Sequence, residues 1–294
     1  MKFVDDVAVV CRAKLLAAAY NLEASSTSED DVLNYLRVAR RRIEPRPRII
    51  HVATELICPP ELQSGFDAVK ARAAAGLSLR PYQSKRVAQP SYEDGLLNAW
   101  DIHHFHLGAS IDASGWASRT GPLLYARITE TDFFCIKILD HGAWTQQDLI
   151  ATIHRNWPGS LSRFRMKEGA GLQPALTDEQ VKTLRDKNVN VAVQVEDGAV
   201  YMSPGLGSMS DGTGVWVGLA RIKLLKICNE LERLITEQMN DANSAVGAAL
   251  AANNIAPDAT DFHLTFDGEN VVLVDGASGV AVNIGPWLAV PALN

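Results

Sequence analysis

The stretch IHHFHLGASIDASGWASRTGPLLYARITETDFFCIKILD (102–140) decides the fold, because three apolar runs in it are separated by polar turns. The runs are IHHFHLG (102–108), PLLYARI (122–128) and FFCIKILD (133–140), and a tight turn over 129–132 joins the last two. Short runs that are rich in β-branched and aromatic residues and bounded by turn residues are typical of strands. The stretch therefore predicts three strands joined by hairpins in an antiparallel sheet.

Helical periodicity dominates the sequence before this stretch. Apolar residues recur at helical spacing over 3–22 and over about 29–43, and prolines directly after the second segment end its helix. Residues 48–57 predict a strand, and residues 61–75 predict a helix that ends at a glycine. We therefore expect a mostly helical N-terminal region over 1–90 and a central histidine-rich sheet domain over 91–158.

The sequence after the sheet predicts a second region of mixed structure. A helix with Thr145 as its N-cap follows the sheet, and residues 159–176 are interpreted as a linker. The elements expected in the C-terminal domain (177–294) are a helix (178–186), a hairpin (189–203), helices over 215–239 and 241–253, and further hairpins over 262–284. The predicted fold class is α+β, with a central antiparallel sheet between a helical N-terminal region and a C-terminal α+β region.

Composition and charge exclude several classes of protein. With 47% hydrophobic and 21% charged residues, the chain of 294 residues is neither disordered as a whole nor fibrous. The net charge of -6 argues against a nucleic-acid surface over the whole molecule, although it allows a local basic groove. Charged residues interrupt the N-terminal apolar run, and no window reaches the roughly 20 apolar residues of a membrane span. We therefore expect a soluble, cytoplasmic protein without a membrane partner.

Histidine and tryptophan are concentrated around the predicted sheet. Five of the seven histidines lie within 103–154, and four of the six tryptophans lie within 100–157. Strand alternation places His104 and His106 on one face and His103 on the other, and His141 directly follows the third strand. Because histidine is the side chain best suited to proton transfer near neutral pH, this concentration indicates an acid–base site.

A specific order of features runs from residue 119 to residue 142. Arg119 is followed by the strand LLYARI, a short acidic turn and the run FFCIKILDHG. The sheet of a known protein family has the same order. Over residues 100–157 the chain resembles RelE/ParE-type toxins of the barnase–EndoU–colicin–RelE group, and as a whole it resembles a bacterial protein. The resemblance implies RNA cleavage without a metal, in which a base takes the 2′-hydroxyl proton and cations hold the phosphate. It further implies that Arg119 holds the phosphate and that His141 acts as acid or base.

The first hypothesis for the function is a metal-independent endoribonuclease of toxin or phage-defence type, which needs no cofactor. Its candidate catalytic residues are His104, His106, His141, Arg119 and Lys137. Its candidate substrate-binding residues are His103, Trp100, Trp116, Tyr125 and Arg127, of which the aromatic side chains would stack a base. The expected partners are RNA and either an inhibitor protein or further copies of the chain.

Two alternatives for the histidines remain open. In a hydrolase that depends on a divalent metal, His104 and His106 would be ligands, because an H-x-H pair on a strand presents two imidazoles to one ion. In a binding protein without chemistry, the histidines and tryptophans would form a packed core. The sequence does not separate these alternatives from the ribonuclease hypothesis.

Basic and glycine-rich segments outside the sheet are further candidates for phosphate binding. The segment RVARRRIEPRPR (37–48) is either a phosphate-binding arm or a solvated helix end. Arg163, Arg165 and Lys167 on the expected linker are candidates to extend a nucleic-acid groove. The loop PGLGSMSDGTG (204–214) lacks a phosphate-loop ending and is interpreted as a mobile loop.

Overall fold

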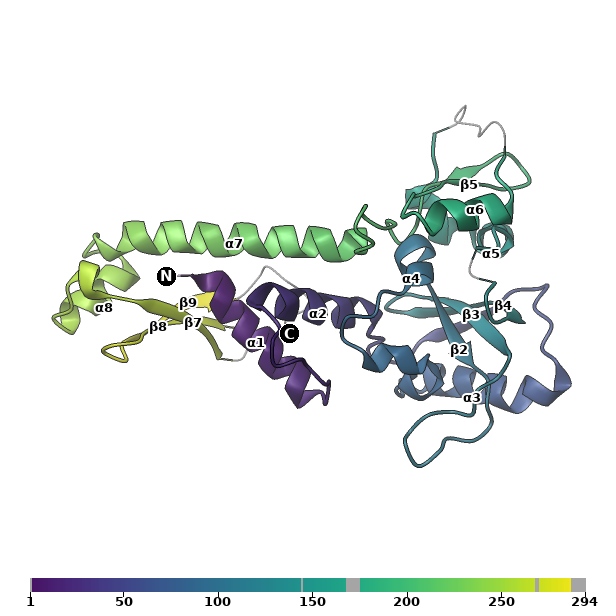
Figure 1. The fold of residues 1–294 in the computed structure, drawn as a ribbon, viewed down its shortest axis with the longest axis horizontal. Helices are drawn as coiled ribbons and strands as arrows, with labels where there is room; N and C mark the ends of the chain where they lie inside the picture. Colours follow the sequence, from purple (N-terminus) through teal and green to yellow (C-terminus); the bar gives the residue numbers. More distant parts are fainter. Residues whose placement is uncertain (1, 144, 168–174, 268–269, 287–294) are drawn as a thin grey trace. The chain divides into compact units, whose positions relative to one another are not determined.

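The computed structural model describes residues 2–143, 145–167, 175–267 and 270–286 (Figure 1). The chain divides into two compact units. The terminal unit consists of Met1–Arg40, Gln89–Ser91 and Val217–Asn294, and the central unit consists of Arg41–Ala88 and Tyr92–Trp216. The terminal unit thus combines both ends of the chain, whereas the four regions expected from the sequence are consecutive segments.

The central unit is built on a four-stranded sheet in the order β1-β4-β3-β2. The predicted strands are confirmed as β2 (Ile102–His106), β3 (Pro122–Ile128) and β4 (Asp132–Asp140), and both of their pairings are antiparallel. A fourth strand, β1 (Ile49–Val52), pairs with β4 in parallel, so the complete sheet is mixed. The predicted α+β class is confirmed.

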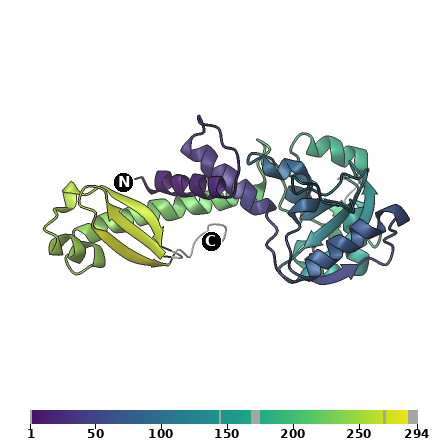
Figure 2. The ribbon, with the colours of Figure 1, turned by 90° about the horizontal axis from the view of Figure 1, so that it is seen from below.

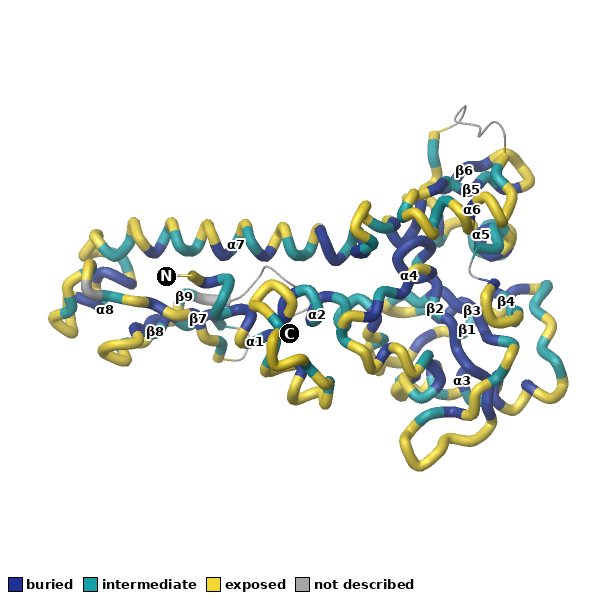
Figure 3. The backbone as a smooth tube through the Cα atoms, viewed as in Figure 1, coloured by how far each residue is buried: buried dark blue, intermediate teal, exposed yellow. Residues whose placement is uncertain are grey.

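Two apolar cores cover the two faces of this sheet. The residues of β2, β3 and β4 are mostly buried (Figure 3). One face packs against α3 (Gln63–Ala74) through residues such as Phe66, Phe105 and Phe133. The other face packs against α4 (Gly95–Trp100), α5 (Asp148–Asn156), α6 (Asp178–Arg185) and the hairpin of β5 (Val193–Gln194) and β6 (Val200–Tyr201). Because side chains alternate along each strand, His104 and His106 share this second face with Tyr125.

The start of α5 differs from the sequence prediction. Thr145 is not its N-cap, because the helix begins at Asp148 after Gln147, whose side chain makes no cap. The backbone N–H of Gln147 instead donates to the carboxylate of Asp178, at the start of α6, over 3.0 Å. A residue 31 positions later in the chain therefore replaces the local cap, which a short sequence pattern does not reveal.

The terminal unit combines helices with a three-stranded antiparallel sheet (Figure 2). Its helices are α1 (Phe3–Ala17), α2 (Ser28–Arg41), α7 (Val215–Met239) and α8 (Ala245–Ala252), and its strands are β7 (Phe262–Asp267), β8 (Asn270–Asp275) and β9 (Ala281–Pro286). Asp6 of α1 accepts a hydrogen bond from the backbone of Leu264 over 2.8 Å and contacts His263. The helix expected over 215–239 is confirmed at both ends.

Short 3-10 helices complete the described structure, over Pro60–Leu62, Arg80–Tyr82, Lys85–Ala88, Pro158–Phe164 and Pro257–Ala259. Across the described residues, no helix combines the length and the apolar character that crossing a membrane requires.

Gly65 of α3 packs closely against the backbone of Leu107, just after β2. A Cβ atom on Gly65 would lie 1.8 Å from the carbonyl oxygen of Leu107, whereas one on Gly95 of α4 would meet no atom within 4 Å. We expect Gly65→Ala to lower the free energy of unfolding by about 1–3 kcal/mol, and Gly95→Ala to change it by less than about 0.5 kcal/mol. Urea unfolding followed by circular dichroism measures both, and equal stability of the two variants would contradict the packing.

Candidate functional site

His106 lies at the C-terminal end of β2 and is only 7% exposed. Its Nδ1 lies 3.2 Å from the backbone nitrogen and 3.3 Å from the carbonyl oxygen of Thr120, so the backbone of Thr120 holds this ring nitrogen. Burial, reinforced by the charge of Arg119, lowers the pKa of His106 to about 4. His106 is therefore a neutral imidazole at physiological pH.

His104, two residues earlier on the same face, is 6% exposed and lies beside a carboxylate. Its Nδ1 is 4.0 Å from Oδ2 of Asp94. Burial lowers the pKa of His104, and Asp94 opposes this shift while His141 reinforces it. Asp94 also caps α4 by accepting from the N–H groups of Leu96 and Leu97, so one carboxylate fixes the helix and faces the imidazole.

His141 completes the group and is its exposed member. It follows β4, and its backbone N–H donates to the carbonyl of Gly121 over 3.1 Å. The charge of His141 lowers the pKa of both His104 and His106, so the three rings lie within electrostatic reach of one another. The structure thus brings together imidazoles that are about 35 residues apart in the chain.

Arg119 and Trp116 lie beside this histidine group on the long connection between β2 and β3. Arg119 is exposed and donates to the carbonyl of Gln83 over 2.7 Å, and its charge contributes to the lowered pKa of His106. Its guanidinium carbon is 5.3 Å from the ring centroid of Trp116, which is only partly buried. The charge of Arg119 therefore acts on His106, and a partly buried aromatic ring accompanies this cation.

Trp100 and Tyr125 are core residues, which corrects their assignment as base-stacking groups. Both side chains are 0% exposed, so neither ring offers a face to a base. The guanidinium carbon of Arg185 covers the Trp100 ring at 3.7 Å, and the Tyr125 hydroxyl donates to the carbonyl of Asp140 over 3.3 Å.

Arg127 and His103 also lie apart from the histidine group. Arg127 is buried and pairs with Asp101 at 3.4 Å, which compensates its charge inside the protein. His103 lies on the opposite face of β2, with its ring centroid 6.2 Å from that of Phe105. These contacts are structural, and the side chain of His103 faces away from that of His104.

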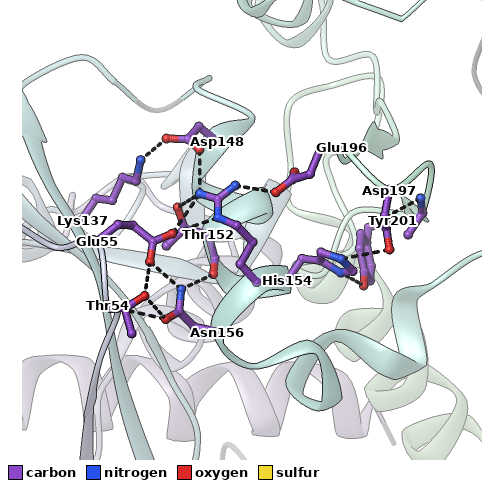
Figure 4. A network of polar contacts seen from close by, with 12 residues as sticks. Thr54, Glu55, Lys137, Asp148, Thr152, His154, Asn156, Glu196, Asp197 and Tyr201 are labelled. Carbon is purple, nitrogen blue, oxygen red and sulfur yellow. Dashed lines mark hydrogen bonds and ion pairs between the residues drawn. The ribbon is translucent and has the colours of Figure 1, made fainter.

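Lys137 belongs to a different polar group, which is centred on Arg155 of α5 (Figure 4). It forms an ion pair with Asp148, which also accepts from Arg155 over 3.2 Å. Arg155 in addition binds Glu55 and Glu196, at 2.9 and 2.7 Å. The charge of Lys137 is therefore compensated by this group, and the structure does not bring it to the histidines as a phosphate ligand.

The Arg155 group joins three segments that are far apart in the sequence. Although burial opposes the shift, hydrogen bonds from Asn156, Arg155 and Thr54 lower the pKa of Glu55 to about 2. The spacing of these residues gives no signal that could have found the group, because Arg155 and Glu55 are 100 positions apart.

A histidine that the sequence analysis does not select lies next to the Arg155 group. His154 bonds the Tyr201 hydroxyl at 2.7 Å through Nδ1 and Asp197 at 3.2 Å through Nε2 (Figure 4). Both ring nitrogens are thus committed to partners from the hairpin of β5 and β6, so this imidazole fastens α5 to that hairpin.

Among the described residues, the structure adds no further ligands to His104 and His106 for the metal-dependent alternative. Within the parts of the chain that the structure describes, no group of three or more His, Cys, Asp or Glu side chains is arranged to hold a metal ion. His104 and His106 remain two imidazoles on one strand face, and the metal alternative stays a prediction.

Comparisons with known proteins assign no family to the chain, because no family model, no curated protein and no solved structure matches it. The resemblance of residues 100–157 to RelE/ParE-type toxins therefore stays a prediction, and the chemistry of the site rests on its geometry.

The lowered pKa of His106 predicts a specific loss of stability in acid. Its pKa is about 4 in the folded protein and about 6.5 in the unfolded chain, so the unfolded chain binds more protons between these values. Stability therefore falls as the pH falls from 7 to 5, by about 2 kcal/mol from this residue.

The variant His106→Asn keeps an acceptor for Thr120 but does not titrate, so its stability should vary less between pH 7 and pH 5 than that of the wild type. The control His103→Asn, on the other face of β2, should keep the wild-type difference. Urea unfolding at the two pH values measures all three proteins, and an equal pH dependence of wild type and His106→Asn would contradict the prediction.

Proposed function

We propose that this protein is a metal-independent endoribonuclease whose acid–base site consists of His104, His106 and His141. The observation that carries the proposal is that the backbone of the exposed His141 bonds Gly121, just before β3, while the buried His106 at the end of β2 pairs with Leu123 of β3. Buried and exposed imidazoles have different environments, and a difference in environment is what separates a base from an acid in one site.

The proposed reaction is an internal transesterification of RNA. The neutral pair of buried imidazoles accepts the proton of the 2′-hydroxyl as its oxygen attacks the phosphorus, and the bond to the 5′-oxygen breaks. His141, the exposed ring, protonates the leaving 5′-oxygen, so the products are a 2′,3′-cyclic phosphate and a 5′-hydroxyl. Arg119 stabilises the charge on the phosphate oxygens, and Trp116 is the base-stacking candidate that keeps open surface.

A second candidate function, a binding protein without chemistry, is favoured by one observation. His104 and His106 are almost completely buried, and Nδ1 of His106 is satisfied by the backbone of Thr120. In that protein the two rings serve as packed core residues, and substitution of the exposed His141 has no consequence for a reaction.

The two functions are separated by cleavage of a single-stranded RNA oligonucleotide in the presence of EDTA. We expect the full chain to release fragments with 2′,3′-cyclic phosphate ends. Loss of a general acid costs about 10²–10⁴-fold in rate, so His141→Ala should slow cleavage by that factor. The matched control His103→Ala removes an imidazole from the opposite face of the same sheet and should leave the rate unchanged.

Analysis of the fragments by mass spectrometry identifies the cyclic phosphate, and circular dichroism confirms that both variants fold. Cleavage that stops on addition of EDTA would favour the metal-dependent alternative. A wild-type protein that binds RNA but leaves it intact would favour the second candidate function.

A further inference from the structure

Two hollows adjoin each other in the central unit on the side of α4 and α6. The first has a volume of about 300 Å³ and is lined by residues of α4, α6 and the glycine-rich loop, among them Asn98, Arg185 and Ser208. The second has a volume of about 420 Å³ and is lined by residues 163–166 and by residues near β6. Asn190 and Ser203 line both hollows, so the two adjoin, and we call them together the Asn190 groove.

One wall of the Asn190 groove is the segment 163–166, which the sequence predicts to be part of a linker. This segment is fixed to β6, because Met166 donates its N–H to Val200 over 2.8 Å and Phe164 accepts from Met202 over 2.9 Å. This backbone pairing holds Arg163 and Arg165 at the second hollow. The segment is therefore a structured edge of the groove rather than a free connection.

The opposite wall is the glycine-rich loop over 204–214, and it is fastened at several points. Asn190 exchanges two hydrogen bonds with the backbone of Ser208, at 2.8 and 2.9 Å, and the N–H of Gly207 donates to the Asn98 carbonyl over 2.7 Å. Gly207 has a φ of 90°, and a Cβ atom there would lie 2.0 Å from Oδ1 of Asn190. Only glycine therefore fits this position, and the loop has a defined conformation that differs from the mobile loop expected.

The lining of the groove carries positive charge in an acidic protein. Its charged residues are four cations, Arg163, Arg165, Lys182 and Arg185, and two carboxylates, Glu93 and Asp186. Lys182 is paired with Asp186 at 3.2 Å, and Arg163 and Arg165 are exposed at the second hollow. Since the whole chain has a net charge of -6, this local excess of cations is a departure from the rest of the protein.

Arg185 is the least exposed of these cations and is backed by an aromatic ring. Its guanidinium carbon is 3.7 Å from the ring centroid of Trp100, and burial lowers the pKa of Arg185 to about 10. A guanidinium with few water contacts, held close to an indole, keeps its edge donors in a geometry that suits a phosphate oxygen pair.

Apolar surface accompanies the cations in the second hollow. The guanidinium carbon of Arg163 is 5.6 Å from the ring centroid of Phe164, and Met202 and Leu206 are 50% and 42% exposed. Alternation of cations with an aromatic ring and flat apolar side chains is the composition of surfaces that bind unpaired bases and the phosphates between them. A duplex would hide its bases from such a surface, so the groove fits a single strand.

Helix α4 connects the Asn190 groove to the histidine group. Glu93 and Gly95 line the first hollow, and Asp94 lies between them in the sequence with its carboxylate 4.0 Å from Nδ1 of His104. The groove and the acid–base site therefore share the N-terminal end of one helix.

We propose that the Asn190 groove binds single-stranded RNA, with Arg163 and Arg165 holding phosphates in the second hollow. The identity of the ligand as RNA rests on the proposed function, whereas the groove and its cations are independent of it. Binding and cleavage are therefore measured separately.

Fluorescence anisotropy with a fluorescein-labelled RNA oligonucleotide tests the groove, using the full chain with His141→Ala and EDTA to prevent cleavage. In this background, Arg163→Gln/Arg165→Gln should weaken binding at least about tenfold. The slope of log K against log salt concentration should also fall in magnitude by about 1.4, because each phosphate contact with a single strand contributes about 0.7. The control Lys223→Gln/Arg233→Gln removes two exposed cations of α7 and should change neither quantity.

Equal RNA affinities of Arg163→Gln/Arg165→Gln and of the His141→Ala background would contradict the proposal that the groove binds RNA. The absence of RNA binding by the background protein would contradict it as well. Circular dichroism melting shows whether the groove variant is folded, and Arg163→Lys/Arg165→Lys, which keeps both charges, should recover most of the salt slope. RNA binding that depends on the two arginines in a protein without cleavage activity would support the groove and refute the proposed function. RNA cleavage that does not depend on the two arginines would support the proposed function and refute the groove.

Discussion

The antiparallel pairing of β3 with both β2 and β4 is the constraint on which the central unit depends. Once His104 lies opposite Tyr125 and Leu124 lies opposite Ile138, alternation assigns the side chains of β2 and β3 to one of two faces, and a bulge beside Tyr125 and Ala126 shifts the alternation once along β4. One face receives α3 and the other receives α4, α5 and α6 (Figure 1). A slip of one residue would exchange these faces and move both site histidines into the core below α3.

The same pairing explains why the histidines are chemically distinct from one another. His104 and His106 point into a covered face and are held with lowered pKa values, whereas His141 lies just beyond the covered strand and is exposed. Burial of an imidazole has a cost in stability at acidic pH, because the charged ring is favoured in the unfolded chain. Apolar side chains of the same volume would not have this cost.

Strand alternation and helical periodicity were sufficient to predict β2, β3, β4 and the helix over 215–239, because each depends on local pattern. They could not predict the parallel pairing of β1 with β4, the unit formed by both chain ends, or the replacement of the Thr145 cap by Asp178. For the site, alternation placed His104 and His106 on one face, whereas the role of Arg119 came from the resemblance to RelE/ParE-type toxins, and the buried ring of Trp100 was placed among the base-stacking groups. Burial is a property of the whole fold, and a residue's neighbours in sequence do not determine it.

The arginines show most clearly why a basic pattern alone does not locate an RNA surface. In the segment 37–48, the buried Arg41 donates to the Tyr92 carbonyl, and the buried Arg48 donates to the carbonyls of Thr129 and Glu44. These guanidinium groups satisfy backbone acceptors inside the protein, so their donors are committed and their charges are not offered to a polyanion. Arg163 and Arg165, which the sequence pattern does not distinguish from them, are exposed at a groove. The surface proposed to bind RNA is therefore defined by which donors the fold leaves at a hollow, and the density of positive charge in the sequence is secondary.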